Sequence, residues 1–175
     1  MQMTSEQVKA LQQVALQTLE NEAKITQRVI EAIPAEKCSY KPDSVSMCSI
    51  DLAKHIANSE LEFLRGIVAG KFDFSASVPE SVKTPADVSR WYGEELQKVT
   101  AELKALPPEK LSAVIDFMGF MQLPGILYLN LAVNHSIHHR GQLSMHLRPM
   151  GAKVPSIYGP SYDTEQEQKA ASAAS

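Results

Sequence analysis

Hydrophobic residues recur at intervals of three and four in the N-terminal part of the chain, the spacing that places side chains on one face of an α-helix. The first such segment begins with Thr4-x-x-Gln7, a capping-box pattern, and stops at Pro34. Its apolar face comprises Val8, Leu11, Ala15, Leu19, Ala23, Ile30 and Ile33. A long amphipathic helix is therefore predicted between Thr4 and Pro34.

Two further amphipathic segments have clear ends. One begins after Ser49 and ends at Gly70, and its inward face comprises Ile50, Ala53, Ile56, Ala57, Leu61, Leu64 and Val68. The other begins at Thr84-Pro85-x-Asp87, which supplies an N-cap, a proline at the first helical position and an acid in the first turn. Its face comprises Val88, Trp91, Tyr92, Leu96, Val99 and Leu103, and Pro107-Pro108 ends it. Residues 34–48 and 71–83 are predicted to be connections.

The segment before the last helix has no clear period. Residues 109–124 contain Phe117-Met118-Gly119-Phe120-Met121, which is apolar but interrupted by glycine, and they end at Pro124. We interpret this segment as a short strand-like pass or a lid, and its apolar run as a core or dimer contact rather than a substrate-binding wall. A long fourth helix is predicted from about residue 125 to residue 148.

The C-terminal end differs in composition from the rest of the chain. Beyond Asp163 a Glu/Gln-rich run and Ala-Ala-Ser-Ala-Ala-Ser offer no core-forming residues, so residues 164–175 are predicted to be a disordered tail. Residues 1–163 are predicted to form one all-α domain. Four amphipathic helices favour a four-helix bundle, an architecture that builds metal sites from side chains on facing helices.

Composition narrows the function classes. The 175 residues carry a formal charge of −3 with scattered Lys and Arg, which argues against nucleic acid as a partner. We expect no membrane span, because no apolar run approaches the roughly 18 residues that one needs. We see no secretory signal in the N-terminal sequence. Cys38 and Cys48 are interpreted as free thiols, so a cytoplasmic protein is expected.

The most informative stretch lies in the predicted fourth helix. Asn134-His135-Ser136-Ile137-His138-His139-Arg140-Gly141-Gln142-Leu143 holds three of the five histidines. His135 and His139 are separated by about 40° of rotation and about 6 Å of rise, so their imidazoles can reach one metal ion. Arg140 points about 140° away from this stripe and is expected to pack, form an ion pair or make an interface contact.

A third ligand must come from elsewhere. His146 shares the stripe but lies about 10 Å beyond His139 along the helix axis, too far for bonds of about 2.0–2.1 Å to one ion. The histidine left is His55, on the margin of the buried face of the second helix. Three histidine ligands would keep at least one coordination position open, as in catalytic zinc sites.

Other interpretations of these residues stay open. A single half-buried histidine such as His55 is more often a satisfied core residue than a ligand. His135 and His138, three residues apart, form an alternative pair. Cys38 or Cys48 as a fourth ligand would make the site a closed, structural one. Because a bundle of this length does not need a metal to fold, a metal in its core favours chemistry.

The chain resembles the DinB/YfiT-like superfamily over residues 5–163. The resemblance is carried by His55, by His135-x-x-x-His139-Arg140-Gly141-Gln142-Leu143 and by Pro155-Ser156-Ile157-Tyr158-Gly159-Pro160-Ser161. It implies a four-helix bundle in up-down-down-up order, often a homodimer, in which three histidines hold a divalent metal, commonly nickel or zinc. By position, the ligands implied here are His55, His135 and His139.

The resemblance also implies a class of chemistry. Some members of the superfamily are transferases or isomerases that use low-molecular-weight thiols such as mycothiol, bacillithiol or glutathione. We therefore expect a metal-dependent enzyme that acts on a small-molecule substrate, a transferase of thiol groups or a hydrolase, with no catalytic residue assigned beyond the metal ligands. The alternative is a non-catalytic helical interaction or scaffold protein with a structural metal or none.

Overall fold

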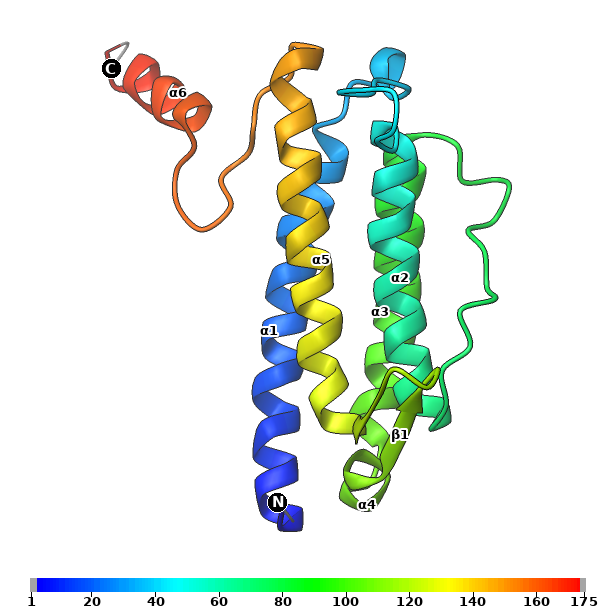
Figure 1. The fold of residues 1–175 in the computed structure, drawn as a ribbon. Helices are drawn as coiled ribbons and strands as arrows, with labels where there is room; N and C mark the ends of the chain where they lie inside the picture. The colour runs from blue at the N-terminus through cyan, green and yellow to red at the C-terminus, as the bar shows by residue number, and fades with distance from the viewer. Residues whose placement is uncertain (1–2, 174–175) are drawn as a thin grey trace.

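The computed structural model describes residues 3–173, and four long helices make up its body (Figure 1). These are α1 (Ser5–Glu31), α2 (Ser49–Ala69), α3 (Pro85–Ala105) and α5 (Gly125–Leu147). The shorter elements are η1 (Ala35–Lys37), α4 (Pro108–Ser112), β1 (Val114–Phe117), β2 (Met121–Pro124), η2 (Arg148–Met150) and α6 (Tyr162–Ala173). The predicted four-helix bundle is confirmed.

The four long helices run up, down, down and up in the view of Figure 1. After α2 the chain returns along the outside of the bundle before α3 begins, which is why α2 and α3 run in the same direction. Each long helix packs on two others: α5 lies against α2 and α1, and α3 lies against the same two helices from the other side.

Local signals set the helix ends where the sequence predicts them. The Thr4 hydroxyl accepts a hydrogen bond from the Gln7 amide at 3.2 Å, and the Gln7 side chain accepts one from the Thr4 amide at 2.9 Å. Thr84 and Asp87 form the same reciprocal pair at the start of α3. At the end of α2, Gly70 adopts a left-handed conformation with φ 72°, which favours glycine because the residue has no Cβ.

The inward faces of the four helices form one apolar core. Most positions of the predicted apolar faces are buried there, and Leu11, which is 43% exposed, is an exception on the side of α1 that faces α5. The largest fully buried aliphatic side chains are Leu19, Ile30, Ile56, Leu61, Leu64, Leu103, Leu111, Leu129 and Leu143.

Residues 109–124, interpreted as a strand-like pass or a lid, form the end of α4 and an antiparallel hairpin. Its strands pair from Val114 with Pro124 to Phe117 with Met121. The Tyr128 hydroxyl fastens the hairpin to α5, since it donates to the Ile115 carbonyl at 2.9 Å and accepts from the Leu123 amide at 3.2 Å. The hairpin therefore lies at the lower end of the bundle in Figure 1.

The prediction of disorder beyond Asp163 is corrected by α6, which continues to Ala173. The Ser161 hydroxyl caps this helix by accepting from the Thr164 amide at 3.1 Å, and the following Glu, Gln, Lys and Ala residues have high helix propensity. None of its residues is buried, which agrees with the lack of core-forming residues. The last two tail residues, 174 and 175, lie outside the described residues.

No helix within residues 3–173 is both long enough and apolar enough to cross a membrane.

Candidate metal centre

Two of the three predicted ligands lie one turn apart on α5. The ring centroids of His135 and His139 are 4.5 Å apart. His55 approaches them from the facing helix α2, with its ring centroid 5.3 Å from His135 and 4.5 Å from His139. One nitrogen from each ring lies within 4.8 Å of the other two. The structure thus brings together the three histidines that the sequence selects.

The spacing of these nitrogens suits a single ion. His55 Nε2 and His139 Nε2 are 3.2 Å apart. Two nitrogens bound at about 2.0–2.1 Å to a tetrahedral ion are separated by roughly 3.4 Å. The cluster is therefore compatible with a site for one divalent metal.

Neighbouring polar groups orient two of the rings. The His139 Nδ1–H donates to the Gln142 side-chain oxygen at 2.7 Å, which leaves the lone pair on Nε2, toward His55. The Ser59 hydroxyl, one turn after His55, contacts the His55 Nδ1 at 3.2 Å and leaves its Nε2 for the cluster. Metal-binding histidines are commonly oriented in this way through their second ring nitrogen.

His135 has no such partner within the described residues. Its Nδ1 is buried and makes no hydrogen bond there. Leaving a buried polar atom unsatisfied costs free energy, about 1–3 kcal/mol for a neutral group. A metal ion bound among the three rings would compensate for part of this cost.

Burial favours the neutral form of His55 and His135. The pKa of His135 is lowered to about 4, mainly by burial and to a smaller extent by the neighbouring His139, His55 and His138. The pKa of His55 is also lowered, first by burial and then by His139. Neutral imidazole is the form that binds a metal, so these ligands are available at neutral pH without a prior loss of protons.

The alternative ligands do not join this cluster. His138 is exposed and contacts the Gln142 amide nitrogen at 3.2 Å, outside the group of converging nitrogens. The Cys48 thiol lies 2.9 Å from an Asp51 carboxylate oxygen, and burial raises its pKa. Cys38 also lies outside the group. His146 is bound to Ser49 instead, in agreement with its predicted distance from the pair.

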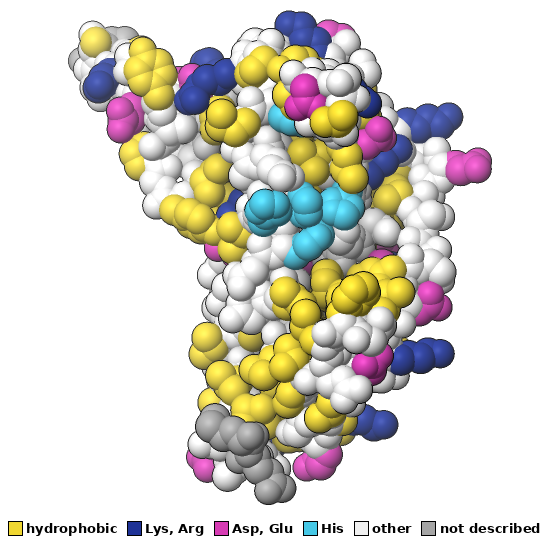
Figure 2. All heavy atoms as spheres, in the orientation of Figure 1, with side chains coloured by type: hydrophobic (Ala, Val, Ile, Leu, Met, Phe, Trp, Pro, Cys, Tyr) yellow, Lys and Arg dark blue, Asp and Glu magenta, His cyan; other side chains and the backbone are white. Residues whose placement is uncertain are grey.

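A cluster of aromatic rings that sequence reasoning missed lies beside the histidines. The Phe63 ring is 5.7 Å from the His135 ring and stacks on Phe117 of the hairpin at 5.4 Å. Phe117, interpreted as core or dimer contact, therefore packs toward the site. Figure 2 shows a central patch of histidine side chains on the α2–α5 face, with hydrophobic side chains above and below it. Sequence reasoning also missed the roles of Ser59 and Gln142. Their spacing could have indicated them, because Ser59 lies four residues after His55 and Gln142 lies three residues after His139.

Arg140 points away from the metal centre, as its position on the helix predicts. The guanidinium is 1% exposed and forms an ion pair with Glu22 on α1 at 2.7 Å. It also donates to the Glu22 carbonyl at 3.1 Å and to the Tyr158 hydroxyl at 2.8 Å. Of the three alternatives expected for Arg140, which were packing, an ion pair and an interface contact, the structure shows the ion pair. These contacts join α5 to α1 and to the segment after η2.

Comparison with known proteins gives one consistent family. A model described as the DinB family matches residues 3–170. The uncharacterized protein YjoA of Bacillus subtilis is 33% identical over 130 residues, which cover 73% of this chain and 82% of YjoA. The uncharacterized protein YrdA of the same organism is 27% identical over 150 residues, which cover 83% of this chain and 86% of YrdA.

Solved structures agree with these matches. The crystal structure of YjoA, a DinB-like protein, aligns with a TM-score of 0.69 at 28% identity, covering 84% of this chain and 99% of the YjoA chain. A DinB-like protein from Bacillus cereus also gives a TM-score of 0.69, at 24% identity, covering 82% of this chain and 95% of the other. The second likeness supports the fold alone.

Proposed function

The chain belongs to the DinB family, and from this membership and the three-histidine cluster we propose that it is a divalent-metal-dependent enzyme. One observation carries the proposal: three imidazoles converge from two helices, with neither cysteine in the group. Three protein ligands leave at least one coordination position for a substrate or water, which is the arrangement of catalytic zinc sites. Nickel and zinc are the proposed metals, since both accept imidazole.

We propose that the reaction is transfer of a low-molecular-weight thiol to an electrophile, or hydrolysis. A bound divalent metal lowers the pKa of a coordinated thiol or water and so supplies a nucleophile near neutral pH. The protein's own groups hold the ligands in place: Ser59 orients His55, and Gln142 orients His139. The Phe63 ring beside His135 limits the access of water from the hairpin side.

The partners and the cellular location belong to the same proposal. A reaction that consumes a small thiol suits a reducing compartment, and Cys38 and Cys48 are both free, so we propose the cytoplasm.

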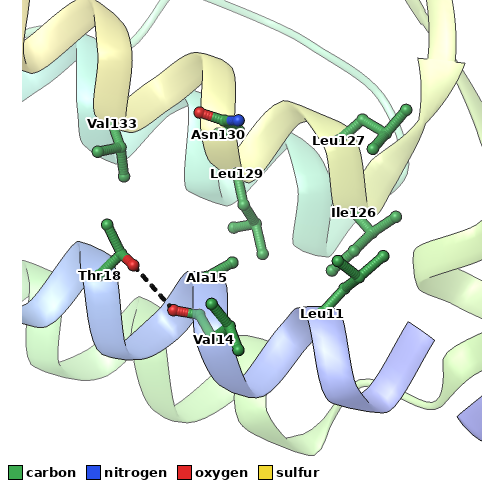
Figure 3. A pocket seen from close by; sticks show the side chains of 9 residues that line it. All are labelled: Leu11, Val14, Ala15, Thr18, Ile126, Leu127, Leu129, Asn130 and Val133. Carbon is green, nitrogen blue, oxygen red and sulfur yellow. Dashed lines mark hydrogen bonds between the residues drawn. The ribbon is translucent and has the colours of Figure 1, made fainter. Parts of the chain in front are cut away.

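A homodimer is proposed through the outer face of α1 and α5. That face has a cavity of about 270 Å³ lined only by uncharged residues (Figure 3), and depletion of charge is typical of the core of protein interfaces.

The first test is the metal content of tag-free protein, measured by mass spectrometry after reconstitution with nickel or zinc. We expect near-stoichiometric metal in the wild type and its loss in His55→Ala, His135→Ala and His139→Ala, with the helical circular dichroism unchanged. His138→Ala is the matched control, because this residue lies next to the cluster but outside it. Loaded protein is then assayed for loss of free thiol from mixtures of a low-molecular-weight thiol and an aryl halide.

Two outcomes would contradict the proposal. If metal is retained in the three variants, or is absent from the reconstituted wild type, the three histidines do not form a metal centre. A metal with four protein ligands and no exchangeable position would favour the alternative, a helical scaffold protein with a structural ion.

A further inference from the structure

A second cavity adjoins the metal centre on the side away from the hairpin. It measures about 550 Å³ and lies between the connection that precedes α2 and the C-terminal half of α5. His139 of the cluster forms part of its wall, so a molecule in this cavity lies against one of the three proposed ligands. The lining residues are Tyr40, Pro42, Ser46, Met47, Leu52, His139, Gln142, Met145, His146 and Pro149.

The lining of this cavity carries no charged side chain. No Asp, Glu, Lys or Arg is among the residues that form it. Its exposed edge is formed by two flexible and polarisable methionine side chains. Met47 is 49% exposed and Met145 is 74% exposed. Methionine adapts to ligands of irregular shape and contacts aromatic rings favourably. A charged ligand would lose its hydration here without gaining a partner, whereas an apolar one would gain by burial.

His146 is the buried polar side chain of this lining, whereas Tyr40, Ser46, His139 and Gln142 are half-buried or exposed. His146 is only 6% exposed, and its Nδ1 is 3.1 Å from the Ser49 hydroxyl. The edge of its ring also contacts Tyr40, with centroids 5.7 Å apart. These contacts fix the ring and engage Nδ1, so Nε2 is the nitrogen left for a ligand. Ser49 is itself fully buried, and its contact with His146 supplies the partner that a buried hydroxyl needs.

His146 is neutral at neutral pH. Burial lowers its pKa, and the acidic Asp43 nearby acts in the opposite direction but is the smaller influence. A neutral imidazole has one donor and one acceptor nitrogen, so it can pair with an uncharged hydroxyl, carbonyl or amide. The polar contact and the apolar lining therefore select the same kind of molecule.

We propose that this cavity binds the uncharged and largely apolar part of the substrate, an aliphatic or aromatic group whose one polar atom is hydrogen-bonded to His146 Nε2. The proposal rests on the proposed function insofar as it places the other end of that molecule at the three-histidine cluster. It names the electrophilic substrate class as neutral and lipophilic, and it gives His146 a binding role that the metal centre does not require.

The test uses protein labelled with ¹³C at the methionine methyl groups and benzyl alcohol as the probe. We expect the signals of Met47 and Met145 to shift in a saturable way, both in the protein as purified and after treatment with a chelator. Met118 and Met121 are internal controls, because they are exposed methionines on the hairpin and do not line the cavity. Benzoate and benzylamine, which carry a charge on the same ring, should leave Met47 and Met145 unshifted.

Two variants separate a binding role from a structural one. His146→Phe keeps a ring of similar size, and we expect it to weaken benzyl alcohol roughly fivefold, the effect of one lost hydrogen bond, while toluene binds as before. Met145→Lys changes a side chain that is already exposed and should weaken both probes without affecting folding. The matched control is Met121→Lys on the hairpin.

Three results would contradict the proposal that the cavity binds an uncharged apolar group. They are the absence of shifts, shifts confined to Met118 and Met121, and equal binding of the charged probes. Unchanged affinity for benzyl alcohol in a folded His146→Phe protein would overturn the role of His146. The shifts are also measured without metal, so they do not depend on whether the three histidines bind an ion. The metal content tests the proposed metal centre separately.

Discussion

Glu60 is a carboxyl group fully enclosed by the bundle. The Tyr92 hydroxyl of α3 donates a hydrogen bond to it, and its other oxygen has no partner within the described residues. Burial raises its pKa to about 7, against the smaller opposing effects of Tyr92, Ser136 and Arg140, while Glu22 adds to the rise. Glu60 is thus the acid whose protonation changes near neutral pH in the interior.

This carboxyl group makes the stability of the fold depend on pH. Its pKa is 4.5 when unfolded and about 7 when folded, so the folded state binds more protons between these values. The free energy of unfolding should therefore fall as pH rises from 4.5 through 7, by about 3 kcal/mol at most. Urea unfolding across this range measures the slope.

Glu60→Gln isolates the effect, because it keeps the shape of the side chain and cannot ionise. We expect this variant to flatten the pH profile and to be more stable than the wild type above pH 7. Glu102→Gln, at an exposed position of α3, is the control and should leave the slope unchanged. A Glu60→Gln protein with the wild-type slope would show that another group causes it.

At the scale of elements, the hairpin depends on one side chain of the following helix. The Tyr128 hydroxyl joins β1 and β2 through the Ile115 carbonyl and the Leu123 amide. The stacking of Phe117 on Phe63 then holds the end of β1 over α2. The position of the hairpin is therefore set by contacts with two helices as well as by its own strand pairing.

Tyr128→Phe should loosen the hairpin while the bundle stays folded. Removing the hydroxyl leaves the Ile115 carbonyl and the Leu123 amide without this partner, at a cost of about 1–2 kcal/mol. We expect faster hydrogen exchange at the Leu123 amide and little change at amides of α2. Tyr162→Phe, at an exposed tyrosine of α6, provides the comparison. Unchanged exchange at Leu123 would argue against an anchoring role.

Helices and hairpin differ in how far they could be predicted. The capping pairs at Thr4 and Thr84 act within one turn, so the sequence places both helix starts correctly. The hairpin turn relies on Met118 and Gly119, both with positive φ, and an isolated Met-Gly pair is a weak signal for such a turn. The tail forms α6 from helix propensity and a Ser161 cap, which the lack of apolar residues concealed.

At the scale of the whole molecule, the outer face of α1 and α5 is the proposed dimer contact. Val14 is 66% exposed and Leu127 is 42% exposed, beside the uncharged cavity of Figure 3. We expect the wild type to sediment as a dimer and Val14→Arg as a folded monomer, because the new charge would be buried without a partner. Val45→Arg, at a position that is 92% exposed before α2, is the control. A monomeric wild type, or a dimeric Val14→Arg protein, would contradict this interface.

The last helix should contribute little to the stability of the body. None of the α6 residues is buried, and α6 projects away from the bundle in Figure 1. Deleting residues 164–175 keeps the Asp163 carboxylate, which accepts from the Val154 amide at 2.9 Å. We expect the free energy of unfolding and the metal content to change little, by less than about 0.5 kcal/mol for the former. A larger loss would mean that α6 packs on a partner.

The four long helices and two of the three candidate ligands could be predicted from local patterns in the chain. Prolines and capping residues act over a few positions, and helix geometry alone places His135 and His139 on one stripe. His55 could be selected from the sequence because it was the remaining histidine on another predicted helix, but its meeting with the pair depended on how α2 packs on α5.

The surroundings of that centre result instead from how the helices pack on one another. The placement of Phe63 beside His135, the burial of Glu60 and the cavity at His146 all depend on the rotation and axial offset of one helix against another. Those quantities result from the packing of many side chains distant in the chain, and no local pattern encodes them. The sequence thus selected the candidate ligands, whereas the fold decided what lies next to them.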